Sequence, residues 1–400
     1  MTVDTMRVVD FWAGVPLCAL STPIHKLFCK SGVSEPKNVL LIELSEMGST
    51  ILADPMMQKL KNAGCNLHFV IFKKNKPSLD LLKSIPEENI YTINDSGLGN
   101  IIKDTLGFLV WCRKKNIDSV IDLELFSRFT ALLTGFCGAG IRVGYHAFTQ
   151  EGLYRGNMLT KKVAYNSHQH ISKNFIALAD ALLSKEQQTP FTKRAVGDDE
   201  IKLRKISISE NEKDFMRKKM QAQCDKLDFN KHRVALFNAN ASDLMPLRRW
   251  GRKNYIELGK RLLAKDENLY IYLTGALAER DGLQFIADAL GERCVNFAGK
   301  TTFTELPLLY SSCIFMLTND SGPAHFAAVT DLPTFVIFGP ETPKLYGSLG
   351  NFTPIYAGLS CSPCVSAHNH RKTVCDDNQC VKQISVDYVD GVLKGFFDVN

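Results

Sequence analysis

One segment, Leu317–Pro343, places an aspartate, a serine and a glycine between an apolar run and an expected helix. We expect a buried strand to end at Thr318 and a helix to start near Gly322. Asp320 or Ser321 then occupies the N-cap region. Backbone N–H groups and the positive end of a helix dipole bind a diphosphate at such a position, and a glycine lets the phosphate approach the main chain. Simple capping of the helix by Asp320 and Ser321 fits the residues equally well.

Four closely spaced cysteines near the end of the chain form a second chemical group. They are Cys361, Cys364, Cys375 and Cys380. Two residues separate the first pair, ten separate the second and third cysteines, and four separate the last pair. Four thiolates can hold a tetrahedral zinc ion, and His368 or His370 could replace one thiol ligand. Two disulfides or four reduced thiols are the alternatives.

The elements that must position these groups alternate, because short apolar runs are followed by amphipathic stretches from Asn38 onward. This alternation is typical of βαβ units around a parallel sheet. The expected strands are residues 38–44, 67–72, 90–93, 119–125 and 141–145, then 233–238, 269–274, 294–298, 314–317 and 334–338. We therefore predict an arm (1–37), a Rossmann-like α/β domain (38–184), a polar connection (185–230) and a second Rossmann-like domain (231–400). Ligands of open α/β sheets bind at the carboxyl ends of the strands.

The composition agrees with two globular domains. The chain has 400 residues, of which 45% are hydrophobic and 22% are charged, and this length exceeds what one core usually supports. Its net charge of +6 is a mild excess that favours anionic ligands or anionic membrane surfaces. No basic run or motif typical of nucleic-acid binding is present, so we exclude that class. Cysteines scattered through apolar segments indicate a reducing cytosol.

The arm before the first domain combines apolar and basic residues. They are Phe11, Trp12, Leu17, Leu20 and Phe28, with Arg7, Lys26 and Lys30. Its apolar stretch, Val8–Leu20, is too short to span a bilayer, and Asp10 within it argues against a signal peptide. Such an arm can lie in a membrane interface, or it can dock against the first domain.

Four stretches in chain order resemble the bacterial heptosyltransferases of glycosyltransferase family 9. They are NVLLIELSEMG at 38–48, GIRVGY at 140–145, residues 234–250, in which a basic residue precedes Trp250, and TNDSGPAH at 318–325 followed by FGPETP at 338–343. The resemblance runs from about Asn38 to Lys382. It implies the GT-B architecture, in which two Rossmann-like domains face a central cleft. It also implies inverting transfer of heptose from ADP-heptose, without a required cofactor, to a lipopolysaccharide-core acceptor at the cytoplasmic side of the inner membrane.

The resemblance also implies roles for residues of the second domain, where the family binds the nucleotide-sugar donor. The donor-binding candidates are Arg248, Arg249, Glu279, Asp320, Ser321, Gly322 and His325. Arg248 or Arg249 matches the position that meets the diphosphate, where a cation stabilises the leaving group. Glu279 matches a position near the ribose, and His325 could donate to a phosphate oxygen. The alternatives are a solvated basic turn, an acidic first helical turn and a packed histidine.

The chain departs from the family at the expected catalytic base. The family has an aspartate after the glycine of its first loop, whereas this chain has Ser49, and a serine hydroxyl does not accept a proton at neutral pH unless another base activates it. Glu46 in the same loop is the expected substitute base, and Glu124 at the end of another strand is the second candidate. We expect Asp54 to cap a helix. The departure leaves two other hypotheses open, a nucleotide-sugar binding protein without the base and a nucleotide-sugar epimerase.

Overall fold

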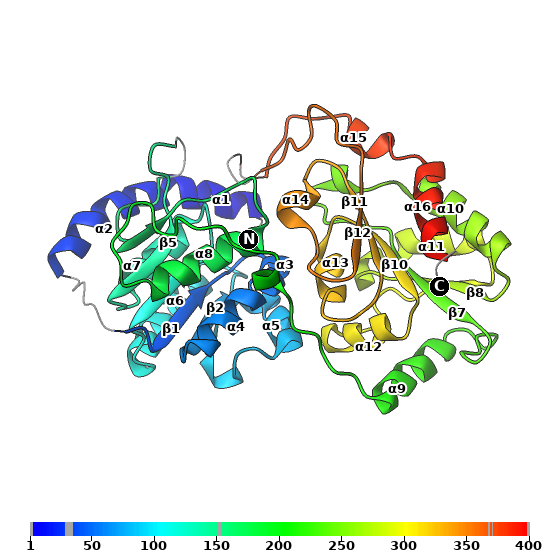
Figure 1. Cartoon of the computed structure of the whole chain (residues 1–400), viewed down its shortest axis with the longest axis horizontal. Coiled ribbons are helices and arrows are strands. Elements are labelled where there is room, and N and C mark those ends of the chain that lie inside the picture. Colours follow the sequence, from blue (N-terminus) through cyan, green and yellow to red (C-terminus); the bar gives the residue numbers. More distant parts are fainter. Residues whose placement is uncertain (1–2, 29–34, 151–153, 367–368, 370, 398–400) are drawn as a thin grey trace. The chain divides into compact units, whose positions relative to one another are not determined.

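A computed structural model of the chain describes residues 3–28, 35–150, 154–366, 369 and 371–397 (Figure 1). The chain forms two compact units, Met1–Lys202 and Leu203–Asn400. The boundary between them falls inside the stretch 185–230 that the sequence predicts as the connection. Within the described ranges, no helix is both long enough and apolar enough to cross a membrane.

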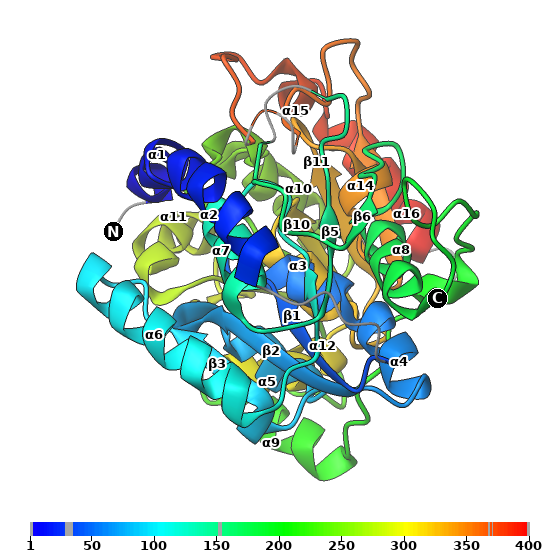
Figure 2. The same ribbon diagram turned by 90° about the vertical axis from the view of Figure 1, so that its left-hand side faces the viewer.

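The first unit is built on a parallel sheet in which the strand order is β3-β2-β1-β4-β5-β6. Its strands are β1 (Asn38–Ile42), β2 (Asn66–Phe72), β3 (Ile90–Ile93), β4 (Ser119–Asp122), β5 (Ile141–Tyr145) and β6 (Lys161–Val163). Its helices are α1 (Val3–Trp12), α2 (Gly14–Phe28), α3 (Met47–Leu52), α4 (Asp54–Asn62), α5 (Pro77–Leu82), α6 (Leu98–Lys114), α7 (Arg128–Phe136) and α8 (Ile171–Leu183). Apolar side chains of α6 and α7 pack on one face of this sheet, and Figure 2 shows α6 running across β2 and β3.

The central strands β1 and β4 of this sheet are neighbours, and their register brings Ile42 opposite Asp122. Both strands are buried along most of their length, as expected for a parallel sheet covered on both faces. The residues that follow Ile42 and Asp122 therefore meet at one edge of the sheet. Glu46 and Glu124 belong to these two following segments.

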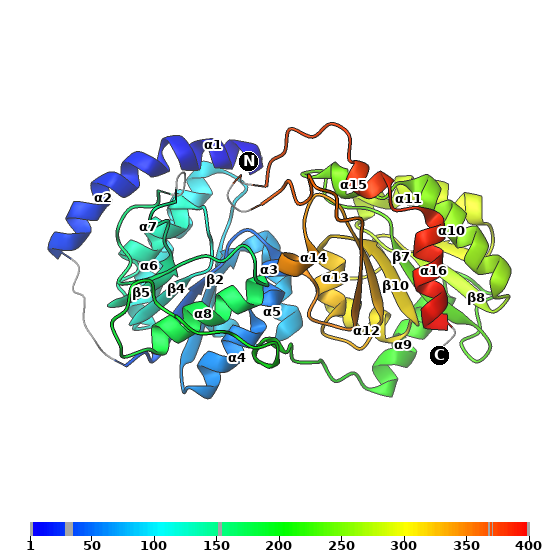
Figure 3. The ribbon, with the colours of Figure 1, turned by 45° about the horizontal axis from the view of Figure 1, so that its top comes forward.

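The arm folds as helices α1 and α2, which pack against α7 (Figure 3). Asp10 accepts hydrogen bonds from the backbone N–H groups of Arg128 and Phe129, at 3.1 and 2.9 Å. A carboxylate there satisfies the first N–H groups of α7 and complements the helix dipole. Of the arm residues named above, Lys30 and the side chains of Lys26 and Phe28 lie outside the described residues.

The second unit repeats the architecture with a parallel sheet in the order β12-β11-β10-β7-β8-β9. Its strands are β7 (Arg233–Asn238), β8 (Leu269–Leu273), β9 (Cys294–Asn296), β10 (Phe315–Asn319), β11 (Thr334–Phe338) and β12 (Phe352–Tyr356). Its helices are α9 (Glu210–Gln221), α10 (Arg252–Lys265), α11 (Arg280–Leu290), α12 (Leu306–Ser311), α13 (Gly322–Ala327), α14 (Pro343–Tyr346), α15 (Gln379–Lys382) and α16 (Val386–Phe397). The main core lies between the sheet and helices α10, α11, α15 and α16.

Candidate functional site

Arg248 and Asp320 lie together at the carboxyl end of β10 in the second unit. Asp320 directly follows the strand and is buried. The Nη1 atom of Arg248 lies 3.8 Å from Oδ2 of Asp320. A guanidinium has five N–H donors, so a contact with one carboxylate oxygen leaves others that can bind an anion. Two of the predicted donor-site residues are thus brought together by the fold.

The turn that carries Arg248 is held by Asn319 and Trp250. The backbone N–H of Trp250 donates to Oδ1 of Asn319 at 3.0 Å, and the amide of Asn319 donates to the carbonyl of Asn240 at 3.2 Å. The indole N–H of Trp250 donates to the carbonyl of Ile384 at 2.6 Å. These bonds fix the main chain on both sides of Arg248. Sequence reasoning did not assign a role to Asn319, although it directly precedes Asp320.

Arg249 and Glu279 bond to their own loops instead. The guanidinium of Arg249 donates to the carbonyl of Ala241, at 3.0 and 2.6 Å, and forms an ion pair with Asp243. A carboxylate oxygen of Glu279 accepts the backbone N–H of Ala276 at 2.7 Å. Of the two arginines before Trp250, Arg248 is therefore the better candidate for a diphosphate ligand. The bond of Glu279 agrees with the structural alternative, a carboxylate at the start of a helix.

The short helix α13 begins as the sequence predicts. Ser321 occupies the N-cap position in an extended conformation, but its side chain makes no capping bond to the helix. Its hydroxyl donates to the carbonyl of Asn319 at 3.1 Å. A Cβ atom at Gly322 would lie 3.0 Å from the ring of Phe326, so close packing against that ring favours glycine. His325 is buried in the same helix.

Glu46 and Ser49 are directly hydrogen-bonded in the first unit. The hydroxyl of Ser49 donates to Oε2 of Glu46 at 2.9 Å. The sequence predicts both residues in one loop, which is wrong for Ser49. Glu46 is the N-cap residue of α3, and Ser49 is buried in its first turn. The serine at the family's aspartate position thus contacts the carboxylate that we expect to replace it.

Glu124 reaches from the end of β4 to the segment after β1. One carboxylate oxygen accepts the backbone N–H groups of Leu44 and Ser45, each at 3.2 Å, and the hydroxyl of Ser45 at 2.8 Å. Burial raises the pKa of Glu124; the bond from Ser45 opposes this rise, and the charges of Glu46 and Asp122 add to it. Both predicted base candidates therefore belong to one cluster. Glu124 is engaged with the backbone, which makes Glu46 the better candidate.

A buried ion pair between Asp122 and Arg155 supports this cluster. Arg155 also donates to the carbonyls of Glu124 at 2.7 Å and Ser127 at 2.9 Å, while Asp122 accepts the backbone N–H of Glu124 at 3.1 Å. Burial raises the pKa of Asp122, and the charge of Arg155 opposes that rise. Asp122 and Arg155 also line a cavity of about 290 Å³, together with Tyr145, His146 and neighbouring residues. Sequence reasoning missed both residues. Asp122 lies within an expected strand, and its partner Arg155 lies in an irregular segment without any repeating pattern, so nothing in the sequence linked the two.

Asp54 does not cap a helix as the sequence predicts. The N-cap residue of α4 is Ala53, and Asp54 is the first residue of the helix. Its buried carboxylate accepts hydrogen bonds from the hydroxyl of Ser84 and, at 3.1 Å, from the amide of Gln58. Asp54 thus ties α4 to the chain after α5 and is absent from the Glu46 cluster.

The four C-terminal cysteines lie near one another in the second unit. Burial raises the pKa of the Cys380 thiol most, and the nearby thiols of Cys364, Cys375 and Cys361 raise it further by electrostatic repulsion. The thiol of Cys375 donates to the carbonyl of Asp377 at 3.3 Å. Among the described residues, no three Cys, His, Asp or Glu side chains are arranged to hold a metal ion. The alternative ligands His368 and His370 lie outside the described residues.

Comparisons with known proteins point to one family. Residues 112–374 match the sequence profile of "Glycosyltransferase family 9 (heptosyltransferase)". The chain is 26% identical over 231 residues to lipopolysaccharide heptosyltransferase 2 of Escherichia coli strain K12. That match covers 56% of this chain and 59% of the relative, so it spans less than two thirds of the relative's length.

Two solved structures of this family resemble the chain along most of its length. The ADP-heptose lps heptosyltransferase II of E. coli has a TM-score of 0.66 at 20% identity, covering 90% of this chain and 98% of the other. The E. coli heptosyltransferase WaaC with ADP has a TM-score of 0.63 at 18% identity, covering 90% and 99%. The two parallel six-stranded sheets and these neighbours confirm the predicted GT-B fold. Because the family profile matches well over half of its residues, the chain belongs to glycosyltransferase family 9.

Proposed function

We propose that the protein is an inverting glycosyltransferase that moves heptose from ADP-heptose to a sugar of the lipopolysaccharide core. Family membership and the named heptosyltransferase relatives support this activity. The structural neighbour with ADP supports an adenine nucleotide donor. The observation in this chain that carries the proposal is the contact between Arg248 and Asp320 at the carboxyl end of β10.

Arg248 would bind the donor diphosphate and stabilise the negative charge that develops when nucleoside diphosphate leaves. Asp320 would position the guanidinium, and the backbone bonds of Trp250 would limit its movement. The side chain of Arg248 thus supplies the cation, so we propose that transfer requires no cofactor. Glu279 and His325 remain proposed ligands of the ribose and a phosphate, respectively.

Glu46 would act as the general base that takes the proton from the acceptor hydroxyl. Its contact with Ser49 gives the carboxylate one fixed hydrogen bond. The reaction is then a single displacement: the acceptor oxygen bonds to the anomeric carbon, the bond to the diphosphate breaks, and the proton passes to Glu46. The cavity lined by Asp122 and Arg155, both of which bond to the backbone of Glu124, is our proposed position for part of the acceptor.

A thermal-shift screen followed by product analysis tests the activity. ADP and ADP-heptose should stabilise the protein more than uridine or guanosine nucleotides, because a ligand of the folded state raises apparent stability. A transferase releases ADP in proportion to glycosylated acceptor. An epimerase would instead convert the donor sugar without an acceptor. A protein that binds ADP-heptose but never glycosylates an acceptor would contradict the proposed activity and favour a binding protein.

We propose that the outer face of the arm contacts the cytoplasmic surface of the inner membrane. Phe11, Trp12, Leu17 and Leu20 are exposed on α1 and α2, with Trp12 74% and Leu20 65% accessible. The opposite face docks against α7, which leaves these apolar side chains to a partner. A tryptophan beside aliphatic side chains is typical of an interfacial helix.

The double variant Trp12→Ser with Leu20→Ser should bind vesicles of phosphatidylethanolamine and phosphatidylglycerol about tenfold more weakly, since each change removes apolar area that the bilayer buries. Cosedimentation measures this effect. Leu277→Ser is the matched control, because Leu277 is 70% exposed in the second unit. Equal binding by all three proteins would contradict the membrane proposal.

We also propose that the four cysteines bind zinc. Their spacing and their proximity around Cys380 support a common site, and because no three of the described side chains are arranged to hold a metal ion, the thiols would have to close around the zinc when it binds. Protein purified under reducing conditions without chelators should contain about one zinc per chain by elemental analysis. Cys361→Ser with Cys364→Ser should abolish that content, whereas Cys224→Ser, outside the group, should retain it. A zinc content well below one per chain would refute the site.

A further inference from the structure

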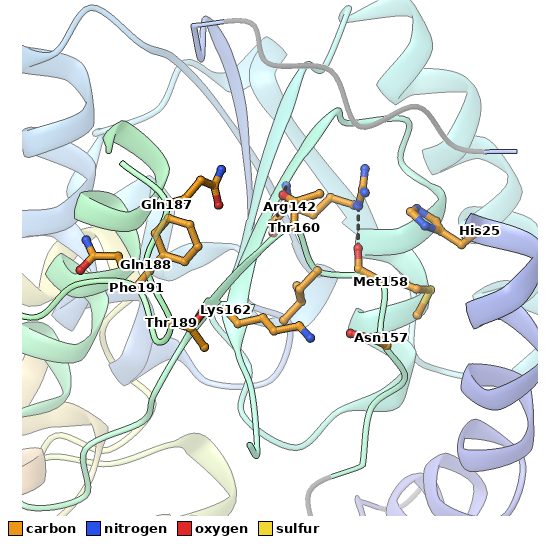
Figure 4. Close-up of a pocket in the computed structure, with 11 residues that line it drawn as sticks. His25, Arg142, Asn157, Met158, Thr160, Lys162, Gln187, Gln188, Thr189 and Phe191 are labelled. Carbon is orange, nitrogen blue, oxygen red and sulfur yellow. Dashed lines mark hydrogen bonds between the residues drawn. The ribbon is translucent and has the colours of Figure 1, made fainter. Parts of the chain in front are cut away.

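A cavity of about 450 Å³ lies in the first unit, away from the Glu46 cluster (Figure 4). Its lining includes Arg142, which is the second residue of β5 and so lies toward the amino end of that strand. Glu46 and Glu124, by contrast, follow the carboxyl ends of β1 and β4. The volume is within the usual range for small-molecule sites. None of the roles assigned above uses this cavity.

Among the residues that the structure describes, the lining carries positive charge and no carboxylate. Arg142 and Lys162 contribute the two cations, while Gln187, Gln188 and Thr160 contribute neutral polar groups. The guanidinium of Arg142 is held by the carbonyls of Met158 at 2.7 Å and Ala139 at 2.5 Å, the first of which Figure 4 draws as a dashed line. A concave surface lined by one sign of charge attracts ligands of the opposite sign. The charge of the lining therefore favours an anion.

His25 adds a hydrogen-bond acceptor to the same wall. Its side chain is only 4% exposed, and in Figure 4 the ring points from α2 toward Arg142 and Met158. The imidazole is hydrogen-bonded to the backbone of Gly135, and its Nε2 atom has no hydrogen-bond partner among the residues described. Burial, and then the charge of Arg142, lower the pKa of His25, so the ring is neutral at pH 7. A buried acceptor of this kind is stabilised when a ligand donates to it.

We infer that this cavity binds an acidic sugar, that is, a monosaccharide unit bearing a carboxylate or a phosphate. The anionic group would lie between the two cations of the lining, in contact with Lys162 and near Arg142. A sugar hydroxyl would donate to Nε2 of His25. The amides of Gln187 and Gln188 can donate to and accept from further hydroxyls. The inference concerns binding alone and is independent of glycosyl transfer.

Isothermal titration calorimetry on the full chain, without any nucleotide, tests the site. Glucuronate and glucose 6-phosphate should each bind at least tenfold more tightly than glucose, which lacks the charge. Glucuronate carries a carboxylate and glucose 6-phosphate carries a phosphate, so comparing their affinities shows which anionic group the cavity prefers. Binding of either sugar supports the site. Both should also bind more tightly than inorganic phosphate, which lacks the hydroxyls. No binding of either sugar acid at 10 mM, or equal binding of phosphate or glucose, would overturn the inference.

Two variants connect this binding to the cavity. Lys162→Gln should weaken binding of the sugar acids about tenfold, the scale of one hydrogen bond to a charged group. His25→Asn keeps a donor near the position of Nδ1 but removes Nε2, so it should weaken binding while circular dichroism and melting temperature stay near wild type. Lys193→Gln is the control, because Lys193 is exposed and does not line the cavity. Unchanged affinity in both Lys162→Gln and His25→Asn would place the ligand elsewhere and refute the assignment.

Discussion

Glu46→Gln should lower turnover by about a hundredfold or more while it leaves the affinity for ADP-heptose unchanged. The change removes the proton acceptor but keeps the size of the side chain and an oxygen that can accept from Ser49. A positioned general base contributes about a hundredfold to ten-thousandfold. Single-turnover kinetics with saturating acceptor measure the chemical step, and calorimetry measures donor affinity.

Glu124→Gln is the matched control for this prediction, because it makes the same change in a carboxylate of the same cluster. Its remaining oxygen can still accept the N–H groups of Leu44 and Ser45, so most of the activity should be retained. A reversed result, with Glu46→Gln active and Glu124→Gln inactive, would place the base on the β4 side. Ser49→Asp gives a further test, since higher turnover would mean that α3 presents the family's carboxylate competently.

Arg248→Ala should weaken ADP binding about tenfold or more, since a hydrogen bond to a charged group contributes roughly 1.5–3 kcal/mol. Asp320→Ala should weaken it as well, because Asp320 contacts the guanidinium. Calorimetric titration with ADP measures both effects, and circular dichroism checks the fold.

The adjacent Arg249→Ala is the control for Arg248→Ala. It removes the same charge one residue further along, but that guanidinium bonds to Ala241 and Asp243. ADP affinity should therefore stay within about twofold of wild type, the usual size of a surface charge effect. Unchanged affinity in both Arg248→Ala and Asp320→Ala would remove the donor site from this edge of the sheet.

Most of the strands that could be predicted are buried by the fold, and the edge strands β3 and β9 were predicted as well. All ten expected strands are present, with ends that differ by a few residues, because apolar runs identify central strands of parallel sheets. The edge strands β6 and β12 were missed. β6 is three residues long and contains two lysines, and β12 contains Pro354, which lacks a backbone donor and is tolerated only at a sheet edge. Such sequences give almost no strand signal.

The candidate site was predictable where its residues follow strands in order. Arg248, Asp320, Glu46 and Glu124 could all be named from motifs and strand ends, although which of two arginines faces Asp320 could not. Arg155 is different, because its partner Asp122 is 33 residues earlier in the chain. Only the packing of a segment without periodicity brings the two together, so no local pattern could reveal the pair.

The bond between Asp10 and α7 makes the arm a part of the first unit. A fragment starting at Asn38 would lose the carboxylate that holds the first N–H groups of α7, and it would uncover Ala131 and Met158, which pack against Cys18. If the outer face of the arm binds lipid as proposed, that binding and the folding of the unit on the arm's inner face are thermodynamically linked. A bilayer that binds only the docked arm stabilises the first unit by mass action, and loosening of α7 weakens membrane binding by the same free energy.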